Sequence, residues 1–140
     1  MLLQEYGLAK IKKMEIRQGI DLLKIKRIEK IYKKYEQKFL KKFFSDKEIE
    51  QINKSKVEKV KKIAGKISSK EAASKALGTG ISNGITFKDF EILNESNGCP
   101  KLKFYGVAKA KLKNLSSSSI SITHDGEYIV SVVTLLLNDK

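Results

Sequence analysis

The alternation of apolar and polar positions along the chain predicts a mixture of strands and helices. Residues 16–22 alternate as in a strand with one buried face, and Gly19 lies in the interior of that strand. From residue 23 onward, apolar positions recur every three or four residues, which predicts a helix. A second helix is predicted from about residue 54 to residue 77, where valine, alanine and isoleucine share one face.

The C-terminal half has the pattern of short strands joined by turns. The last strand is apolar on both faces, as expected for a central strand or a subunit interface. An Asp-Gly pair at residues 125 and 126 is a turn signal just before it. Helices and mostly hairpin-linked strands together predict an α+β fold. The predicted strands are 86–93, 101–104, 120–123 and 128–137, with a turn at 94–100, a brief helix near 108–115 and a linker at 116–119.

Composition narrows the class of protein. The 140 residues suffice for one domain with an ordinary core, and 41% hydrophobic with 32% charged residues is typical of a soluble globular protein. Cys99 is the only cysteine, so no internal disulfide is possible and a reducing compartment is expected. The first 13 residues lack the apolar core of a signal peptide, and the longest apolar run is too short to span a membrane. We therefore expect a cytoplasmic protein with no membrane partner.

A formal net charge of +13 is typical of proteins that bind acidic partners. One hypothesis is therefore a basic module that binds nucleic acid without catalysis. Against it, only Arg17 and Arg27 among the 29 basic residues are arginine, which is favoured for reading bases and phosphates. Solvated surface is the alternative for each lysine on its own. The clearest cationic pattern is a stripe at helical spacing, formed by Arg27, Lys30, Lys34, Lys38 and Lys41.

The segment from residue 63 to residue 81 carries the clearest chemical pattern. Glu71 and Lys75 are four residues apart, so they share one helix face, and Lys70 adjoins Glu71. The segment ends in Gly78-Thr79-Gly80, where glycines allow backbone N–H groups to be exposed. A carboxylate that can hold a hard cation, close to ammonium groups and a glycine turn, suits a site for a metal-bound polyphosphate.

Each of these features also has a purely structural interpretation. Asp21 lies where a strand gives way to a helix, so it is expected as a helix N-cap. Glu71 would complete a capping box if a helix began at Ser68. The glycine turn is expected as a helix C-cap, and His124, the only histidine, as an incidental turn residue. Against the cap for Glu71, this carboxylate continues an apolar stripe, where it is costly without a cation or hydrogen bonds.

Five stretches, in order, resemble the motifs of the holo-[acyl-carrier-protein] synthases, the small 4′-phosphopantetheinyl transferases. The resemblance runs from about residue 16 to residue 137. Three residues depart from the pattern: Lys66-Ile67 replaces the usual Arg-Phe pair, and Asp125 replaces a hydroxyl residue after the histidine. The stretches are Gly19-Ile20-Asp21 with Arg27, Phe44-Ser45-Asp46-Lys47-Glu48, Lys70-Glu71-Ala72 through Ile81, Phe87 to Ile92 with Gly98 and Pro100, and Ser121-Ile122-Thr123-His124.

The resemblance implies an enzyme that moves the 4′-phosphopantetheine group from coenzyme A to a serine of apo-acyl carrier protein, leaving adenosine 3′,5′-bisphosphate. Asp21 and Glu71 would coordinate Mg²⁺ together with the pyrophosphate of coenzyme A. Lys75 would be catalytic as well, by neutralising the phosphate that leaves. Either Glu71 or a metal-bound hydroxide would take the serine proton, and the sequence does not choose between them. The residues expected to bind coenzyme A are Lys70, Lys75, Gly78, Thr79, Gly80 and His124, with Ser121 or Thr123 nearby.

The resemblance also implies the wider organisation. It predicts the 4′-phosphopantetheinyl transferase fold, a mostly antiparallel sheet against a long helix, in one domain spanning residues 14–140. Residues 1–13 are expected to be a dispensable extension before Met14 or the result of an upstream start codon. The cationic stripe would bind acyl carrier protein for fatty-acid synthesis, and no nucleic acid is expected. Members of this type are homotrimers with active sites between subunits, and an enzyme of this fold that modifies a different carrier domain is a further hypothesis.

Overall fold

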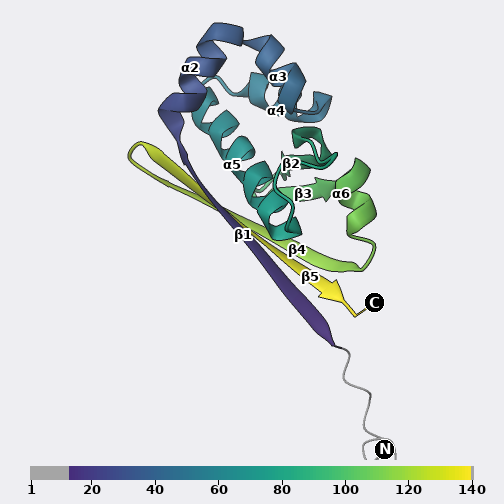
Figure 1. The fold of residues 1–140 in the computed structure, drawn as a ribbon. Helices are drawn as coiled ribbons and strands as arrows, with labels where there is room; N and C mark the ends of the chain where they lie inside the picture. The colour runs from purple at the N-terminus through teal and green to yellow at the C-terminus, as the bar shows by residue number, and fades with distance from the viewer. Residues whose placement is uncertain (1–12, 140) are drawn as a thin grey trace, which may run out of the picture.

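The structure is a computed structural model that describes residues 13–139, and it is an α+β fold, as the sequence predicts (Figure 1). The predicted N-terminal extension lies outside the described residues, apart from Lys13. Within residues 13–139, none of the helices is both long and apolar enough to cross a membrane. The elements are β1 (Met14–Lys24), α2 (Ile25–Tyr35), α3 (Gln37–Phe43), α4 (Asp46–Lys54), α5 (Lys59–Leu77), the short 3₁₀ turn η1 (Phe87–Asp89), β2 (Phe90–Asn94), β3 (Pro100–Phe104), α6 (Gly106–Lys111), β4 (Leu115–Asp125) and β5 (Tyr128–Asn138).

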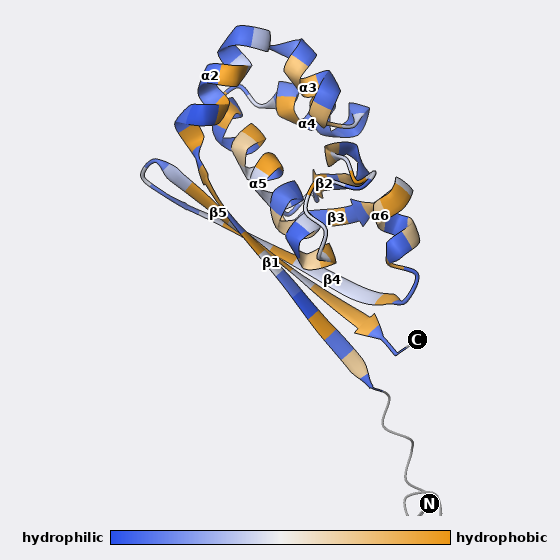
Figure 2. Cartoon of the chain, viewed as in Figure 1, coloured by the Kyte–Doolittle hydropathy of each residue, from blue (hydrophilic) through white to orange (hydrophobic). Residues whose placement is uncertain are grey.

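Two antiparallel sheets pack against the long helix α5. β1, β5 and β4 form a three-stranded sheet in that order, and β2 pairs with β3. The apolar strand β5 is therefore central, which confirms one of the two roles predicted for it (Figure 2). Alternate residues of β5, such as Ile129, Val133 and Leu135, are buried on the side of the sheet that α5 covers.

Helix α5 contributes to two apolar clusters. Its C-terminal half packs with β2, α6 and β5 around residues such as Phe90 and Val133. Its N-terminal half packs with the three preceding helices around Phe39, Leu40 and Ile52. Because neighbours cover α5 on nearly every side, polar groups on this helix must either pair internally or face a defined opening.

Several helix and strand boundaries differ from those predicted from the sequence. The helix expected from residue 23 is divided into α2 and α3 at Glu36, which has a positive φ of 46°. The helix expected from residue 54 begins only at Lys59, because Lys54 ends a separate helix, α4, that the apolar pattern did not reveal. The serine-rich segment 116–119, expected as a linker, lies within strand β4. The small polar side chains of that segment suggested a linker, but β4 pairs along most of its length with β5.

The close contact between β1 and α5 depends on Gly19. A Cβ atom added at this glycine would lie 1.9 Å from the carbonyl oxygen of Ala72 and 2.5 Å from the amide nitrogen of Ala76. The Ser68 hydroxyl of α5 also donates to the carbonyl oxygen of Asp21, at 3.3 Å. Successive side chains of a strand alternate between faces, so Asp21, two residues after Gly19, shares the face that meets α5. The glycine in the strand interior therefore brings Asp21 against the helix.

Candidate active site

Beyond its first turn, helix α5 opens to solvent at two positions one helical turn apart. Between residues 63 and 77, every residue is buried except Glu71, which is half-buried, and Lys75, which is exposed. These two residues are one helical turn apart, so their side chains share one face. The opening lies opposite Asp21 of β1, whose side chain is only 13% exposed. Three charged side chains that the sequence singled out therefore meet at one place.

Electrostatics links these three residues closely. The Lys75 ammonium donates to Asp21 Oδ1 at 3.2 Å and to the carbonyl oxygen of Ile20 at 3.0 Å. Partial burial raises the pKa of the Glu71 carboxyl, and the nearby Asp21 carboxylate raises it further, whereas Lys75 and Arg27 act in the opposite direction. Two like charges thus stand close together on facing elements, and Lys75 and Arg27 are the cations that oppose their repulsion.

The two carboxylates fit a hard divalent cation. Mg²⁺ prefers oxygen ligands and is usually held by one or two carboxylates together with water and substrate phosphates. No group of three or more histidine, cysteine or acidic residues that could hold a metal occurs within the described part of the chain. A cation between Asp21 and Glu71 would relieve the repulsion that raises the pKa of Glu71. The donor set therefore suits Mg²⁺ with a diphosphate, rather than a closed structural metal site.

The structural interpretations of these two acids are wrong. Asp21 lies inside β1, opposite Ser131 of β5, and the following helix begins only at Ile25. Glu71 lies in the body of α5, which runs through Ser68 without a break. Neither carboxylate caps a helix, so neither position is explained by local helix geometry.

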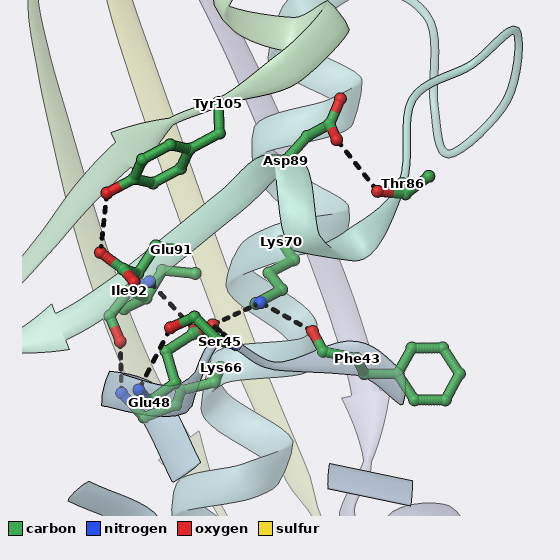
Figure 3. A network of polar contacts seen from close by, with 10 residues as sticks. All are labelled: Phe43, Ser45, Glu48, Lys66, Lys70, Thr86, Asp89, Glu91, Ile92 and Tyr105. Carbon is green, nitrogen blue, oxygen red and sulfur yellow. Dashed lines mark hydrogen bonds and ion pairs between the residues drawn. The ribbon is translucent and has the colours of Figure 1, made fainter. Parts of the chain in front are cut away.

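Lys70 does not face this opening, contrary to the expectation that it binds a phosphate. Its side chain has no exposed surface, and its ammonium contacts Glu48 Oε1 and the carbonyl oxygen of Phe43, each at 2.8 Å (Figure 3). Burial lowers the pKa of Lys70, and the adjacent Glu48 carboxylate opposes that shift. Lys66, at the position of the usual arginine, also points inward and donates to the carbonyl oxygen of Ile92. Both lysines have structural roles in this conformation. They lie one helical turn apart, so they share a face of α5 that points away from Glu71.

The glycine turn is a helix C-cap. Gly78 has a φ of 90° and ends α5, and the N–H groups of Gly78, Thr79 and Gly80 all donate to carbonyl oxygens of the last helical turn. These N–H groups are therefore not available to an anion in this conformation. The Thr79 side chain borders a hollow of about 500 Å³ whose cations the sequence did not point to: Arg17, Lys111 and Lys113. Since these residues come from β1, from the last residue of α6 and from the turn after it, only the tertiary fold assembles this hollow.

His124 lies far from the glycine turn in the same chain. It is exposed near the tip of the β4–β5 hairpin, close to Glu58 at the start of α5, whose pKa is lowered mainly by Lys61 and to a smaller extent by His124. Gly78 lies at the opposite end of α5, whose 19 residues span about 28 Å at 1.5 Å per residue. One bound nucleotide cannot contact both ends of this helix within one chain (Figure 1).

The cationic stripe is exposed but is not continuous. Its members lie on two helices, because Glu36 interrupts the helix between them. Arg27, at the start of α2, is close enough to Glu71 to lower the pKa of that carboxyl. The stripe therefore begins beside the three charged residues of the opening and leads away from them over α2 and α3. All of its members are exposed: Arg27, Lys30, Lys34, Lys38 and Lys41.

The pKa of Glu71 gives a testable pH dependence of the metal-free protein. The raised pKa means that the folded state holds this proton at pH values where the unfolded chain has lost it, so Glu71 lowers stability as the pH rises through that interval. Asp21→Asn removes one cause and should lower the pKa of Glu71, whereas Lys75→Met should raise it further. Carbon-13 NMR titration of the Glu71 carboxyl measures both shifts. An unchanged Glu71 pKa in Asp21→Asn would show that the two carboxylates do not interact.

Comparisons with known proteins extend over most of the chain. The model of the 4′-phosphopantetheinyl transferase superfamily matches residues 17–133. The holo-[acyl-carrier-protein] synthase of Aliarcobacter butzleri is 38% identical over 122 residues, covering 87% of this chain and 98% of that protein. The synthase of Chlorobium phaeovibrioides is 41% identical over 122 residues, covering 87% and 94%. The structure of the Helicobacter pylori synthase in complex with coenzyme A is 38% identical, has a TM-score of 0.73, and is matched over 84% of this chain and 98% of that one.

Proposed function

We propose that this chain, which belongs to the holo-[acyl-carrier-protein] synthase family of the 4′-phosphopantetheinyl transferase superfamily, modifies apo-acyl carrier protein. It does so for fatty-acid synthesis, in the cytoplasm. Coenzyme A donates the 4′-phosphopantetheine group to a carrier serine, and adenosine 3′,5′-bisphosphate leaves. Asp21 and Glu71 hold the Mg²⁺ on which this transfer depends. The family assignment favours the enzyme over the nucleic-acid-binding module that the net charge also suggested.

The residues at the opening of α5 suit this phosphoryl transfer. When bound, the metal ion supplies neutralisation of the negative charge on the diphosphate. Lys75 binds the phosphate that leaves with the nucleotide, giving up its pair with Asp21. The serine oxygen forms a bond to the pantetheine-side phosphorus, and the bond from that phosphorus to the bridging oxygen breaks. The serine proton passes to a base, a role open to the Glu71 carboxylate on the exposed face of α5.

The observation that carries this proposal is the position of Glu71 and Lys75, the two residues not buried between positions 63 and 77, opposite Asp21. The direct test is to incubate the protein with apo-acyl carrier protein, coenzyme A and Mg²⁺. Mass spectrometry should then show one phosphopantetheine arm on the carrier serine, and a chelator should prevent the modification. An unmodified carrier in the presence of Mg²⁺ would reject the proposal.

The carrier protein is expected to dock on α2 and α3. Residues 25–43 carry eight lysines or arginines and two glutamates, and acyl carrier proteins are strongly acidic. An apolar hollow of about 380 Å³ lies at the corner between these helices, lined partly by Ile31, Tyr35 and Phe39. Lys38 stands at the rim of the same hollow. A cationic surface around an apolar depression fits a partner helix with an acidic rim and an apolar centre.

Charge reversal on this surface should weaken carrier binding selectively. The double variant Lys34→Glu/Lys38→Glu is expected to raise the KM for carrier protein about tenfold to a hundredfold at low salt, with kcat little changed. The effect should shrink as salt screens the charges. Lys103→Glu/Lys109→Glu changes the net charge equally on exposed lysines of β3 and α6 and serves as the control. Equal losses in both double variants would remove the argument for a specific docking surface.

Self-association would bring His124 to the site. Ile16, Ile20 and Leu22 of β1 are 60–68% exposed on the face of the sheet that α5 does not cover. An exposed apolar face of this kind is typical of an interface. We assign this face to a homotrimer in which the hairpin of one subunit places His124 beside the opening of α5 in the next. This arrangement would unite residues that lie at opposite ends of α5 within one chain.

Mixing two inactive variants tests this shared site. If Glu71 and His124 act from neighbouring subunits, refolding Glu71→Gln together with His124→Ala should produce mixed trimers in which about a quarter of the sites are intact. Transfer activity should then recover in the mixture, although each variant alone remains impaired. Sedimentation measures the assembly in parallel. A trimeric mixture without recovered activity would place both residues in the same subunit's site.

A further inference from the structure

A buried ionic cluster lies on the side of α5 that carries Lys66 and Lys70 (Figure 3). Lys70 of α5 and Glu48 of α4 have no exposed side-chain surface, and their charged atoms are 2.8 Å apart. The Lys70 ammonium also donates to the carbonyl oxygen of Phe43, the last residue of α3, and lies 4.7 Å from the ring centroid of Phe44. One ammonium group thus contacts the end of α3 and the first turn of α4.

Glu48 extends these contacts to a third element. Its Oε1 atom accepts from the amide of Ser45, closing a capping box at the start of α4, and its Oε2 atom accepts from the amide of Ile92 in β2. Lys66, one turn before Lys70 on α5, donates to the carbonyl oxygen of the same Ile92. Within residues 13–139, no buried side-chain nitrogen or oxygen is left without a hydrogen-bond partner. The cluster is therefore complete and directional.

The rotation of α5 about its own axis follows from these contacts. Lys70 and Glu71 are consecutive, so their side chains leave the helix about 100° apart. If the Lys70 ammonium is held between α3, α4 and β2, Glu71 is directed toward β1 and Asp21. A rotation or sliding of α5 that displaced Glu71 would have to break the ion pair inside the protein, where an unpaired charge is very costly.

Stability alone does not account for a charged pair at this place. Replacing a buried ion pair by apolar side chains of similar volume is often neutral or stabilising, because removing two charges from water costs about as much as their attraction returns. The contacts of a buried ion pair are directional, unlike apolar packing. The hydrogen bonds of the pair are all made in only one arrangement of the helices. Glu48 and Lys70 meet this description, because together they contact the backbone at residues 43, 45 and 92.

We propose that Glu48 and Lys70 are positioning residues that hold Glu71 in the orientation needed for metal binding, although neither touches the metal or the substrates. The inference rests on the proposed function, because it concerns the metal site of Asp21 and Glu71. The same pair ties the end of α3, on the proposed carrier-docking surface, to the helix that bears Glu71. Removal of the pair should leave a folded protein whose two carboxylates no longer converge well.

The test separates position from stability with three variants. Lys70→Met and Glu48→Gln each remove one charge and should lower Tm, because the remaining group is left buried without its ionic partner. The double variant Glu48→Gln/Lys70→Met removes both charges and should recover much of that loss. Leu112→Ala, a cavity-forming change in the core next to α6, provides a control that is destabilised without a change in the cluster.

The readout is the Mn²⁺ dissociation constant from electron paramagnetic resonance titration, together with the Mg²⁺ concentration that gives half-maximal transfer. In the double variant both values should rise about tenfold to a hundredfold, as for the loss of residues that orient metal ligands. Leu112→Ala should lower Tm and leave both values unchanged. A double variant that binds Mn²⁺ as the wild type does would overturn the inference while transfer by the wild type still supports the proposed function. Failure of the wild type to bind Mn²⁺ or to transfer would instead overturn both.

Discussion

Glu71→Gln is expected to lower kcat/KM for transfer about a thousandfold or more, because loss of a metal ligand removes several kcal/mol of charge stabilisation. Asp21→Asn should have a similar effect, since the two carboxylates approach one another from β1 and α5. Glutamine preserves the shape of the side chain, so the fold should survive. The Tm of the metal-free Glu71→Gln protein at neutral pH should even rise, because the variant removes a half-buried charge that the Asp21 carboxylate repels.

The assay for this prediction is transfer to apo-acyl carrier protein at saturating Mg²⁺, with Tm measured by calorimetry with and without the metal. Mg²⁺ with coenzyme A should raise the Tm of the wild type more than that of either variant, because ligands that bind only the folded state stabilise it. Glu95→Gln, on the exposed loop between β2 and β3, is a suitable control for removing one carboxylate. Near-normal transfer by Glu71→Gln would refute the role assigned to this residue.

Gly19→Ala is expected to reduce both stability and activity. The added methyl group would lie 1.9 Å from the Ala72 carbonyl oxygen and 2.5 Å from the Ala76 amide nitrogen, so one backbone must move. Overpacking of this kind costs about 1–3 kcal/mol or more, and Tm should fall by several degrees. Because Asp21 lies two residues further along β1, it should shift relative to Glu71, and a displacement of about 1 Å at a reacting site can cost a hundredfold in rate.

Gly65→Ala is the matched control for this substitution on α5. A Cβ atom at Gly65 would lie 3.4 Å from the Cδ1 atom of Ile129, which is ordinary contact with the end of a side chain. Alanine is also favoured over glycine within a helix by about 1 kcal/mol. This variant should therefore keep its activity and have a Tm at least as high as that of the wild type, which the transfer assay and calorimetry measure together. A Gly19→Ala protein as stable and active as Gly65→Ala would show that β1 and α5 need not approach so closely.

Much of the fold followed from periodicity, and the errors have physical causes. The alternation around Gly19 and the unbroken apolar run of β5 predicted two strands that the structure confirms. The break at Glu36 was missed because the apolar pattern continues through it, although the backbone turns there. Helix α4 is short, and its main sequence signal is the capping box of Ser45 and Glu48. An analysis of apolar periodicity does not detect such a signal.

Part of the site was also predictable from helical periodicity. Glu71 and Lys75 are one turn apart on one helix, so their shared face follows from the sequence, and the resemblance added Asp21. The burial of Lys70 was not predictable, since the exposure of a helical lysine depends on what packs against it. Here Glu48 and the end of α3 pack against it. The distance between His124 and the glycine turn likewise depends on how the β4–β5 hairpin lies along α5.

Asp21 and Glu71 are expected to bind one divalent cation together with the diphosphate of coenzyme A. The most direct measurement is a crystal structure of the protein with Mn²⁺ and coenzyme A, using the anomalous signal of manganese. We predict a single peak within ligand distance of both carboxylates and of the diphosphate, with the Lys75 ammonium turned from Asp21 toward a phosphate. A peak at any other place, or a bound diphosphate distant from these carboxylates in crystals that still catalyse transfer, would contradict the account.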